Sequence, residues 1–317
     1  MWRGIVDVLK TSPVALQLAD RLGRGAGRVG VLQETIPPAP HRPDVRLFAG
    51  DADDSGLAVT CLGHATCLIR MGGVTLLSDP VFSSRVGVSV GMTAIGPRRL
   101  MRPALQIDEL PRIDALLLTH AHFDHLDRPS LLRLFAEPKA TRELEDRRRP
   151  PAVVPPGVRD LVQDLGYRPR TLRLGASLRI GRVTITAVPV KHWGARVFFD
   201  SRRGYCAYLL EADGRRVLLA SDSAFHDGYR AVAPVDLALP GISAYDPYVA
   251  AHATPEQVAE MMRFARARAV MPIHHKTFRL SHEQIDEPLR RLKAALPDVP
   301  VVAPEVGQVY QAGGPAA

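Results

Sequence analysis

The chain has 317 residues, of which 46% are hydrophobic and 23% are charged. This is the composition of an ordinary globular protein, and it excludes a fully disordered chain, a fibrous protein and a membrane protein with several spans. The 41 Lys and Arg residues outnumber the 33 Asp and Glu residues, and the net charge of +8 favours anionic partners such as nucleic acid, lipid headgroups or phosphate esters.

Residues 1–50 are predicted to form a helix followed by a Pro-rich extended arm, and residues 51–317 are predicted to form the main domain. One face of the arm's helix carries Trp2, Ile5, Val6 and Leu9. Such a face suits either a membrane interface or the protein's own surface, and the sequence leaves both open. No apolar run reaches the length that a membrane-spanning helix requires, so we expect no such helix.

Short apolar runs between turn residues indicate where strands lie. They predict strands at 57–62, 66–70, 74–78, 114–119, 183–190, 206–211, 217–221, 236–239 and 270–273, and a last extended segment at 299–303. Helices are predicted at 131–135, 158–165, 255–268 and 283–296, and residues 83–112 are predicted to be loop-rich. Strands dominate twice along the chain and helices follow each time, which fits two sheets packed face to face with helices outside.

The cysteine content bears on the compartment. Cys61, Cys67 and Cys206 are too few and too irregularly spaced for a disulfide framework. We therefore expect reduced thiols and a cytoplasmic protein, with peripheral membrane contact through the N-terminal arm as a further expectation. The oligomeric state is left open by the sequence.

A dense cluster of candidate metal ligands follows the strand predicted at 114–119. Three histidines and one aspartate fall within six residues, as His120-Ala121-His122-Phe123-Asp124-His125. In a loop at the end of a strand, His120 and His122 can point to one place, and Asp124 and His125 to a second place nearby. Imidazole nitrogen and carboxylate oxygen are suitable ligands for zinc, iron or manganese.

Three further candidates lie downstream in the same kind of position. His192, Asp222 and His274 each come just past the C-terminal end of a predicted strand. Loops at strand ends are where a rigid scaffold presents its functional side chains. A lone histidine in such a loop carries little weight, but three candidates after so dense a cluster support one another.

Together, these residues resemble the metal-binding pattern of the metallo-β-lactamase superfamily, over roughly residues 57–296. The resemblance implies an α/β fold, an αββα four-layer sandwich with a binuclear site along one edge of its sheets. It implies that His120, His122 and His192 hold one divalent metal ion, that Asp124, His125 and His274 hold the other, and that Asp222 bridges the two. We expect two zinc ions, with manganese and iron as alternatives, because these ligands suit all three.

Other segments are similar to the subfamily that contains the N-acyl phosphatidylethanolamine-hydrolysing phospholipase D. They are Gly63-His64-Ala65-Thr66, Ser78-Asp79-Pro80, His192-Trp193, Gly241–Pro247, His252–Glu256 and Pro272–Phe278. The chain departs from that subfamily at His275-Lys276, where Trp-Gly is usual, and at Ser221-Asp222-Ser223, where Gly-Asp-Thr is usual. These departures leave the expected metal site intact and put the identity of the substrate in doubt.

The resemblance implies a binuclear metal-dependent hydrolase. The expected activity is that of a phosphodiesterase of phospholipase D type, which acts on N-acyl phosphatidylethanolamine-like lipids through a metal-bridging hydroxide. The predicted catalytic residues are Asp124, Asp222 and His252. Candidates for positioning a ligand or touching the substrate are His64, Asp79, Tyr245, His275 and Lys276, and Asp79 is expected to orient a metal-bound histidine.

Two alternatives remain. The same site suits a lactonase or another carboxylic-ester hydrolase, in which the attacked atom is a carbonyl carbon instead of phosphorus. The net charge also suits a nucleic-acid-binding protein or a nuclease. We do not expect nucleic acid as a partner, because the chain has no room for an extra domain and no basic stretch interleaved with aromatic residues. The expected partner is an anionic small-molecule or lipid substrate.

Overall fold

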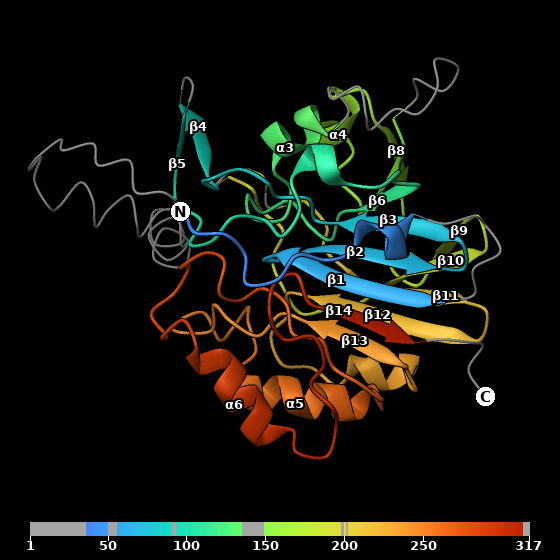
Figure 1. Ribbon diagram of the computed structural model, residues 1–317, viewed down its shortest axis with the longest axis vertical. Helices are drawn as coiled ribbons and strands as arrows, with labels where there is room; N and C mark the ends of the chain where they lie inside the picture. The colour runs from blue at the N-terminus through green and yellow to red at the C-terminus, as the bar shows by residue number, and fades with distance from the viewer. Residues whose placement is uncertain are drawn as a thin grey trace, which may run out of the picture.

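Two β-sheets packed face to face form the centre of the structure (Figure 1). This computed structural model describes residues 36–49, 56–90, 93–134, 149–197, 200 and 202–312. The strands are β1 (Leu57–Gly63), β2 (Thr66–Met71), β3 (Val74–Ser78), β4 (Val88–Val90), β5 (Thr93–Ile95), β6 (Ala115–Leu117), β7 (Pro151–Val154), β8 (Arg168–Thr171), β9 (Ser177–Ile180), β10 (Val183–Val188), β11 (Ala207–Ala212), β12 (Arg215–Ser221), β13 (Leu237–Pro240) and β14 (Val309–Ala312). The α-helices are α3 (Arg128–Arg133), α4 (Asp160–Gln163), α5 (Pro255–Phe264) and α6 (Glu287–Ala295), and the 3-10 helices are η1 (Val45–Phe48), η2 (Ile107–Glu109) and η4 (Gly228–Val232).

Both main sheets are mixed. The seven-stranded sheet has the order β14-β1-β2-β3-β6-β7-β8, antiparallel from β14 to β3 and parallel from β3 to β8. The five-stranded sheet has the order β13-β12-β11-β10-β9, in which only the pair β12 and β13 is parallel. Strands β4 and β5 pair with each other in a small sheet of their own.

Clusters of buried hydrophobic side chains separate four layers. One cluster lies between the two sheets and joins Val59 and Ile69 of the first to Ile185 and Leu210 of the second. Another packs α3 and α4 on the outer face of the seven-stranded sheet, and a third packs α5 and α6 on the outer face of the five-stranded sheet. The layers run helices, sheet, sheet, helices (Figure 1), which confirms the predicted αββα four-layer sandwich.

The central strands agree with the predicted strands because burial dictates their sequence. Every residue of β1, β2 and β3 is buried, since these strands have covered faces on both sides. The start of α5 agrees as well, because Thr254 Oγ1 accepts a hydrogen bond from the Gln257 amide and the Gln257 side chain accepts one from the Thr254 amide.

Several predicted elements differ from the structure. Helix α3 begins at Arg128, before the predicted start at 131, and α5 ends at Phe264, before the predicted end at 268. The segment predicted as a strand at 270–273 forms only isolated bridges, at Val270 and Ile273, because Pro272 between them has no amide hydrogen to donate. The helix predicted from residue 283 begins at Glu287 instead, after an N-cap at Asp286. Strands β4, β5, β7, β8, β9 and β14 were not predicted.

Residues 36–49 of the predicted arm lie against the sandwich. The His41 amide donates to the Val306 carbonyl at 3.3 Å, and Phe48 is fully buried. The amphipathic face with Trp2 and the boundary at residue 50 lie outside the described residues, so the division into arm and domain stays a prediction.

The described cysteines and helices bear on the environment. Cys61, Cys67 and Cys206 are all buried free thiols. Within the described ranges, no helix is long and apolar enough to span a bilayer.

Candidate metal centre

The predicted metal-binding residues meet at one edge of the sandwich, where strands of both sheets end. Asp79 follows β3 and His120–His125 follow β6, and these two strands are parallel neighbours whose C-terminal ends share an edge. In the other sheet, His192 follows β10 and Asp222 follows β12. His274 comes from the segment that bridges to the end of β13. The site is therefore assembled from both halves of the chain.

In the first cluster, three imidazole nitrogens point at one another. His122 Nδ1 lies 2.9 Å from His120 Nε2 and 3.3 Å from His192 Nε2. The Ala251 carbonyl oxygen can only accept, so His192 Nδ1 donates to it at 2.9 Å. The neutral His192 ring therefore presents the lone pair of Nε2 to the cluster.

The same reasoning fixes the tautomer of His120. The Thr119 hydroxyl donates its one proton to Asp79 Oδ2 at 2.6 Å. Thr119 Oγ1 is then the acceptor for His120 Nδ1 at 3.0 Å, which leaves a lone pair on His120 Nε2. The lone pairs of His120 Nε2 and His192 Nε2 are thus both directed at His122 Nδ1.

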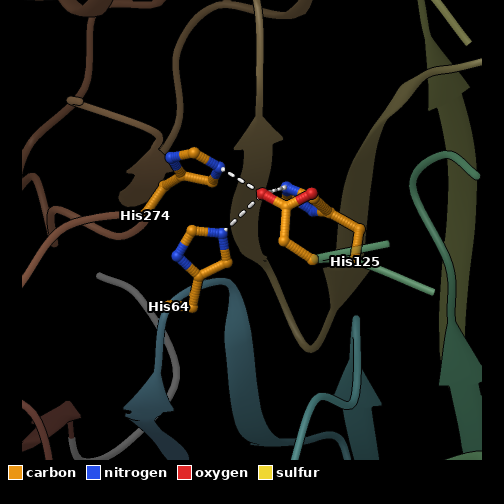
Figure 2. A group of neighbouring side chains, drawn as sticks. His64, His125 and His274 are labelled. Carbon is orange, nitrogen blue, oxygen red and sulfur yellow. Dashed lines mark hydrogen bonds and ion pairs between the residues drawn. The ribbon is translucent and has the colours of Figure 1, made fainter. Parts of the chain in front are cut away.

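The second cluster surrounds the carboxylate of Asp124. Its Oδ2 lies 2.9 Å from His64 Nε2, 3.3 Å from His274 Nε2 and 3.7 Å from His125 Nε2. Figure 2 shows His64 and His274 pointing at the same carboxylate oxygen, with His125 beside it. Asp79 Oδ2 accepts a hydrogen bond from His125 Nδ1 at 2.8 Å, and this bond turns His125 Nε2 towards the cluster.

Asp222 lies between the two clusters. Its Oδ2 is 3.1 Å from His125 Nε2 and 3.1 Å from His274 Nε2. Asp222 also forms one group of closely spaced ligand atoms with His120 and His125, and another with His192 and His252. This is the position that a bridging role requires, although the role itself stays a prediction.

One buried carboxylate orients a histidine in each cluster. Asp79 is bound to His125 directly, and to His120 through Thr119. The Thr119 amide also donates to Asp79 Oδ1 at 2.8 Å. A carboxylate that holds the far nitrogen of a metal-binding imidazole fixes the ring and raises its basicity. The contact expected of Asp79 is present, and it reaches two histidines where one was expected.

Several residues of the site have a backbone conformation that L side chains rarely adopt. The φ angles are +58° at His64, +35° at Asp79, +53° at Ser221 and +61° at His274. Hydrogen bonds between distant segments hold this conformation at His64 and His274, since the His64 amide donates to Thr277 Oγ1 at 2.7 Å and the His274 amide donates to the His64 carbonyl at 2.8 Å. Strain of this kind is kept where the surroundings fix a functional geometry.

Arg196 holds both ends of the loop that carries the first histidines. Its Nη1 donates to the Ala121 carbonyl at 2.8 Å and to the Leu126 carbonyl at 2.7 Å. Its guanidinium lies 4.1 Å from the ring centroid of Phe123, within the range of a cation–π interaction. This role could not be predicted from the sequence, because Arg196 belongs to no motif and is one of many arginines.

Burial and mutual contact set the charges of the site. Burial lowers the pKa of His120, His122 and His192, so these imidazoles are neutral. Burial alone would raise the pKa of Asp124 and Asp222, but neighbouring imidazoles outweigh it and hold both pKa values well below the usual range. The carboxylates are therefore ionised, and in turn they raise the pKa of His125 and His274, whose imidazoles carry the balancing positive charge.

The arrangement fits divalent cations. Ligand nitrogens about 2.0–2.1 Å from one tetrahedral ion lie about 3.3 Å apart, close to the nitrogen separations in the first cluster. Buried Asp222 Oδ1 has no hydrogen-bond partner among the described residues, and buried His125 Nε2 and His274 Nε2 have only ion-pair contacts with carboxylates. Such atoms are costly to bury without a partner, and a bound cation would satisfy them.

His252 adjoins this set at its rim. Its Nδ1 lies 3.8 Å from Asp222 Oδ2, and its side chain remains 11% exposed. Burial lowers its pKa to about 3, so the ring is neutral. His64, predicted to position a ligand or to touch the substrate, is buried inside the second cluster.

Tyr245, His275 and Lys276 lie elsewhere. The Tyr245 hydroxyl donates to Glu287 at 2.9 Å on α6. His275 is buried, and the Lys276 ammonium pairs with Glu305 at 2.8 Å and with Asp286 at 3.2 Å. Because carboxylates already neutralise Lys276 and burial hides His275, the expected contact with an anionic headgroup has no support in the geometry.

A family model described as a β-lactamase superfamily domain matches residues 75–275. The chain belongs to the metallo-β-lactamase superfamily. It is 29% identical over 282 residues to an uncharacterized protein of Mycobacterium tuberculosis, covering 85% of this chain and 72% of that protein. It is 27% identical over 286 residues to the N-acyl-phosphatidylethanolamine-hydrolyzing phospholipase D 1 of Caenorhabditis elegans, covering 82% of this chain and 77% of that protein.

The fold of this superfamily member has solved counterparts. A metallo hydrolase of the archaeon Ignicoccus hospitalis superposes with a TM-score of 0.58 at 18% identity, over 82% of this chain and 99% of that one. At that identity the likeness concerns the fold. The predicted family, the predicted fold and the predicted class, a metal-dependent hydrolase, are confirmed at this level.

Proposed function

We propose that the protein is a binuclear metal-dependent phosphodiesterase of phospholipase D type that hydrolyses N-acyl phosphatidylethanolamine-like lipids. The observation that carries the proposal is the pair of ligand clusters joined at Asp222. In this proposal His120, His122 and His192 hold one ion, Asp124, His125 and His274 hold the other, and Asp222 bridges them. Zinc is the proposed metal, with manganese and iron as alternatives.

Two divalent ions at these residues would supply a deprotonated water at neutral pH and Lewis-acid stabilisation of the phosphoryl oxygens. The chain's own residues prepare that chemistry. Asp79, Thr119 and the Ala251 carbonyl hold the far nitrogens of three histidines, so the ligand atoms are oriented before any ion arrives. Preorganised ligands of this kind need no rearrangement during the reaction.

His252 is the proposed residue for the substrate or the leaving group. It is the neutral imidazole at the exposed rim, and its ring centroid lies 5.1 Å from that of His192 and 5.6 Å from that of His274. A neutral ring with one donor and one acceptor nitrogen can hydrogen-bond a phosphodiester oxygen or a departing hydroxyl group.

The substrate class rests on the relatives and on charge. The nematode relative is named for hydrolysis of N-acyl phosphatidylethanolamine, and it aligns with most of this chain. The net charge of +8 favours an anionic substrate. A cytoplasmic setting is proposed as well, because the three buried thiols are free. Membrane contact through the N-terminal arm stays a prediction, because the amphipathic face that would make it lies outside the described residues.

The test loads metal-free protein separately with zinc, manganese and iron. Hydrolysis is then measured on N-acyl phosphatidylethanolamine, on bis-p-nitrophenyl phosphate and on a panel of lactones. We expect phosphodiester cleavage that His192→Asn abolishes and that the exposed control His282→Asn retains. Lactone cleavage without phosphodiester cleavage would favour the carboxylic-ester alternative, and no turnover with any metal would refute the proposal. Retardation of DNA or RNA at low salt would revive the nucleic-acid alternative.

A further inference from the structure

The small sheet of β4 and β5 stands apart from both main sheets. It is drawn as a separate hairpin that projects from the sandwich (Figure 1), and its strands pair only with each other. A two-stranded hairpin is at most marginally stable in water when nothing packs on it. Both strands are also edge strands, with backbone groups open to a partner. Packing against a further surface would therefore stabilise this hairpin.

The hairpin exposes apolar side chains on one face. Val88 and Ile95 are direct cross-strand partners, and they are 43% and 40% exposed. Leu100, just beyond the hairpin, is 39% exposed. Cross-strand neighbours lie side by side on one face of a sheet, so Val88 and Ile95 form a continuous apolar surface.

The segment around the hairpin carries only positive charge. Between Asp79 and Asp108 the chain has no acidic residue and four arginines, Arg85, Arg98, Arg99 and Arg102. Arg99 is buried and faces inward, where it donates to the carbonyls of Val81 and Ser83 and lies over the Phe278 ring. The other three arginines remain partly or fully exposed. An apolar face near the base of the hairpin, flanked by arginines, complements a membrane surface that has anionic phosphates above its acyl chains.

The foot of the hairpin is tied to the candidate metal centre. The Leu100 amide donates to the Thr277 carbonyl at 2.8 Å, three residues after His274. The Phe278 ring lies 5.2 Å from the ring of His64. A surface that binds the hairpin is therefore brought close to the edge of the sandwich where the ligand clusters lie.

Two facing glycines let the hairpin leave the body of the protein. Gly87 and Gly96 have φ angles of +145° and +155°, and a Cβ on either would collide with the opposite strand at Ile95 O or Val86 O. Below them, Arg85 and Arg98 form an isolated bridge that closes the base. The glycines allow the strands to cross closely at this point, so the hairpin projects with a defined direction.

We propose that the β4–β5 hairpin and its flanking arginines dock on an anionic lipid surface. The choice of lipid as the partner rests on the proposed function, and the charge of the segment supports it independently. In the docked state Val88 and Ile95 enter the interfacial layer while Arg98 and Arg102 contact lipid phosphates. The protein would thus meet its substrate in the plane of the membrane that contains it.

The test measures co-sedimentation of the full chain with vesicles of phosphatidylcholine, alone or mixed with phosphatidylglycerol. We expect preference for the anionic vesicles and weakening as salt rises. Val88→Ser with Ile95→Ser should lower the partition coefficient about tenfold. Arg98→Gln with Arg102→Gln should lower it about fivefold for each arginine that reaches the surface. The matched controls are Leu132→Ser with Leu174→Ser, two exposed leucines elsewhere, and Arg173→Gln with Arg179→Gln, two exposed arginines elsewhere.

Three results would overturn the proposal: no preference for anionic vesicles, equal loss in the control variants, or hairpin variants that bind like the parent. If the parent protein is a dimer in the absence of lipid and the variant with Val88→Ser and Ile95→Ser is a monomer, the hairpin binds a second copy of the chain instead of a membrane. Cleavage of soluble bis-p-nitrophenyl phosphate separates this proposal from the previous one. Turnover without vesicle binding would support the proposed phosphodiesterase activity and refute membrane docking by the hairpin. Vesicle binding without turnover would support membrane docking and refute the proposed activity.

Discussion

Thr119→Val should weaken one metal site and spare the other. The substitution keeps the shape of the side chain and removes the hydroxyl that accepts from His120 Nδ1. The direct bond from His125 Nδ1 to Asp79 Oδ2 is untouched. We therefore expect loss of affinity at the cluster of His120, His122 and His192, with the cluster around Asp124 retained.

The magnitude follows from the burial of the contact. Removing a group that orients a metal-bound histidine typically lowers affinity about 10–100-fold, which corresponds to about 1.4–2.7 kcal/mol. The His120 ring is 1% exposed, so no water replaces the lost acceptor, and an unsatisfied buried donor costs about 1–3 kcal/mol. The two estimates agree, and both place the effect well within reach of a competition titration.

The assay titrates zinc into metal-free protein against a chromophoric chelator that resolves two binding steps. Asp79→Asn serves as the comparison, because Asp79 orients His125 directly and His120 through Thr119, and both steps should weaken. Thr60→Val is the matched control, since the Thr60 hydroxyl is buried and makes no hydrogen bond to the described residues. Equal weakening of both steps by Thr119→Val, or no weakening of either, would refute the assigned tautomers.

Three further outcomes are expected. Arg196→Met should lower the free energy of unfolding by about 3 kcal/mol, because one half-buried guanidinium donates to two carbonyls. Arg128→Met, at a side chain that is 32% exposed, should cost about 1 kcal/mol in the same urea titration. Similar losses from the two variants would contradict a clamp on the loop. Removing bound metal with a chelator should lower the free energy of unfolding by about 2.7 kcal/mol, compared with protein in a metal concentration of a hundred times the Kd. A Tm that calorimetry finds unchanged by the chelator would argue against bound ions. His252→Asn should lower kcat while the metal content, measured by atomic absorption, stays at the parent value, and a loss of metal would instead make His252 a ligand.

The candidate ligands were accessible to sequence reasoning because their chemistry restricts both residue type and position. His120 to His125 form a dense set that no core or surface pattern explains, and the loop after a buried strand is where it stands in the structure. His192, Asp222 and His274 were found because each follows a predicted strand. Strands β10 and β12 run in the same direction on either side of β11, and the bridge of Ile273 to Gly241 brings His274 to the same edge.

The remainder of the site depends on contacts between distant segments. His64 touches Asp124 across 60 positions, and the turn that presents it gives no local sign of that contact. Arg196 clamps carbonyls that lie 75 and 70 positions away. The pairing of Lys276 with Glu305 could not be predicted either, because the sequence does not distinguish a solvent-exposed lysine from one that is paired with a carboxylate.

Unpredicted strands have a related cause. β8 is mostly exposed and β9 alternates between exposed and half-buried positions, so neither carries the apolar run that marks a central strand. β7 begins at Pro151 within a Pro-rich stretch, which reads as a loop from sequence alone. These strands exist because neighbours in the sheet supply their hydrogen bonds.

The division of the candidate ligands between the two sheets has a consequence for how the protein is made. His64 and His274 are separated by more than two hundred positions, yet their rings lie 3.9 Å apart. A growing polypeptide that has not yet completed its second sheet cannot present the second cluster to an ion. Under the proposed function, metal uptake would therefore be a late event in biogenesis, and only a correctly finished molecule would retain both ions.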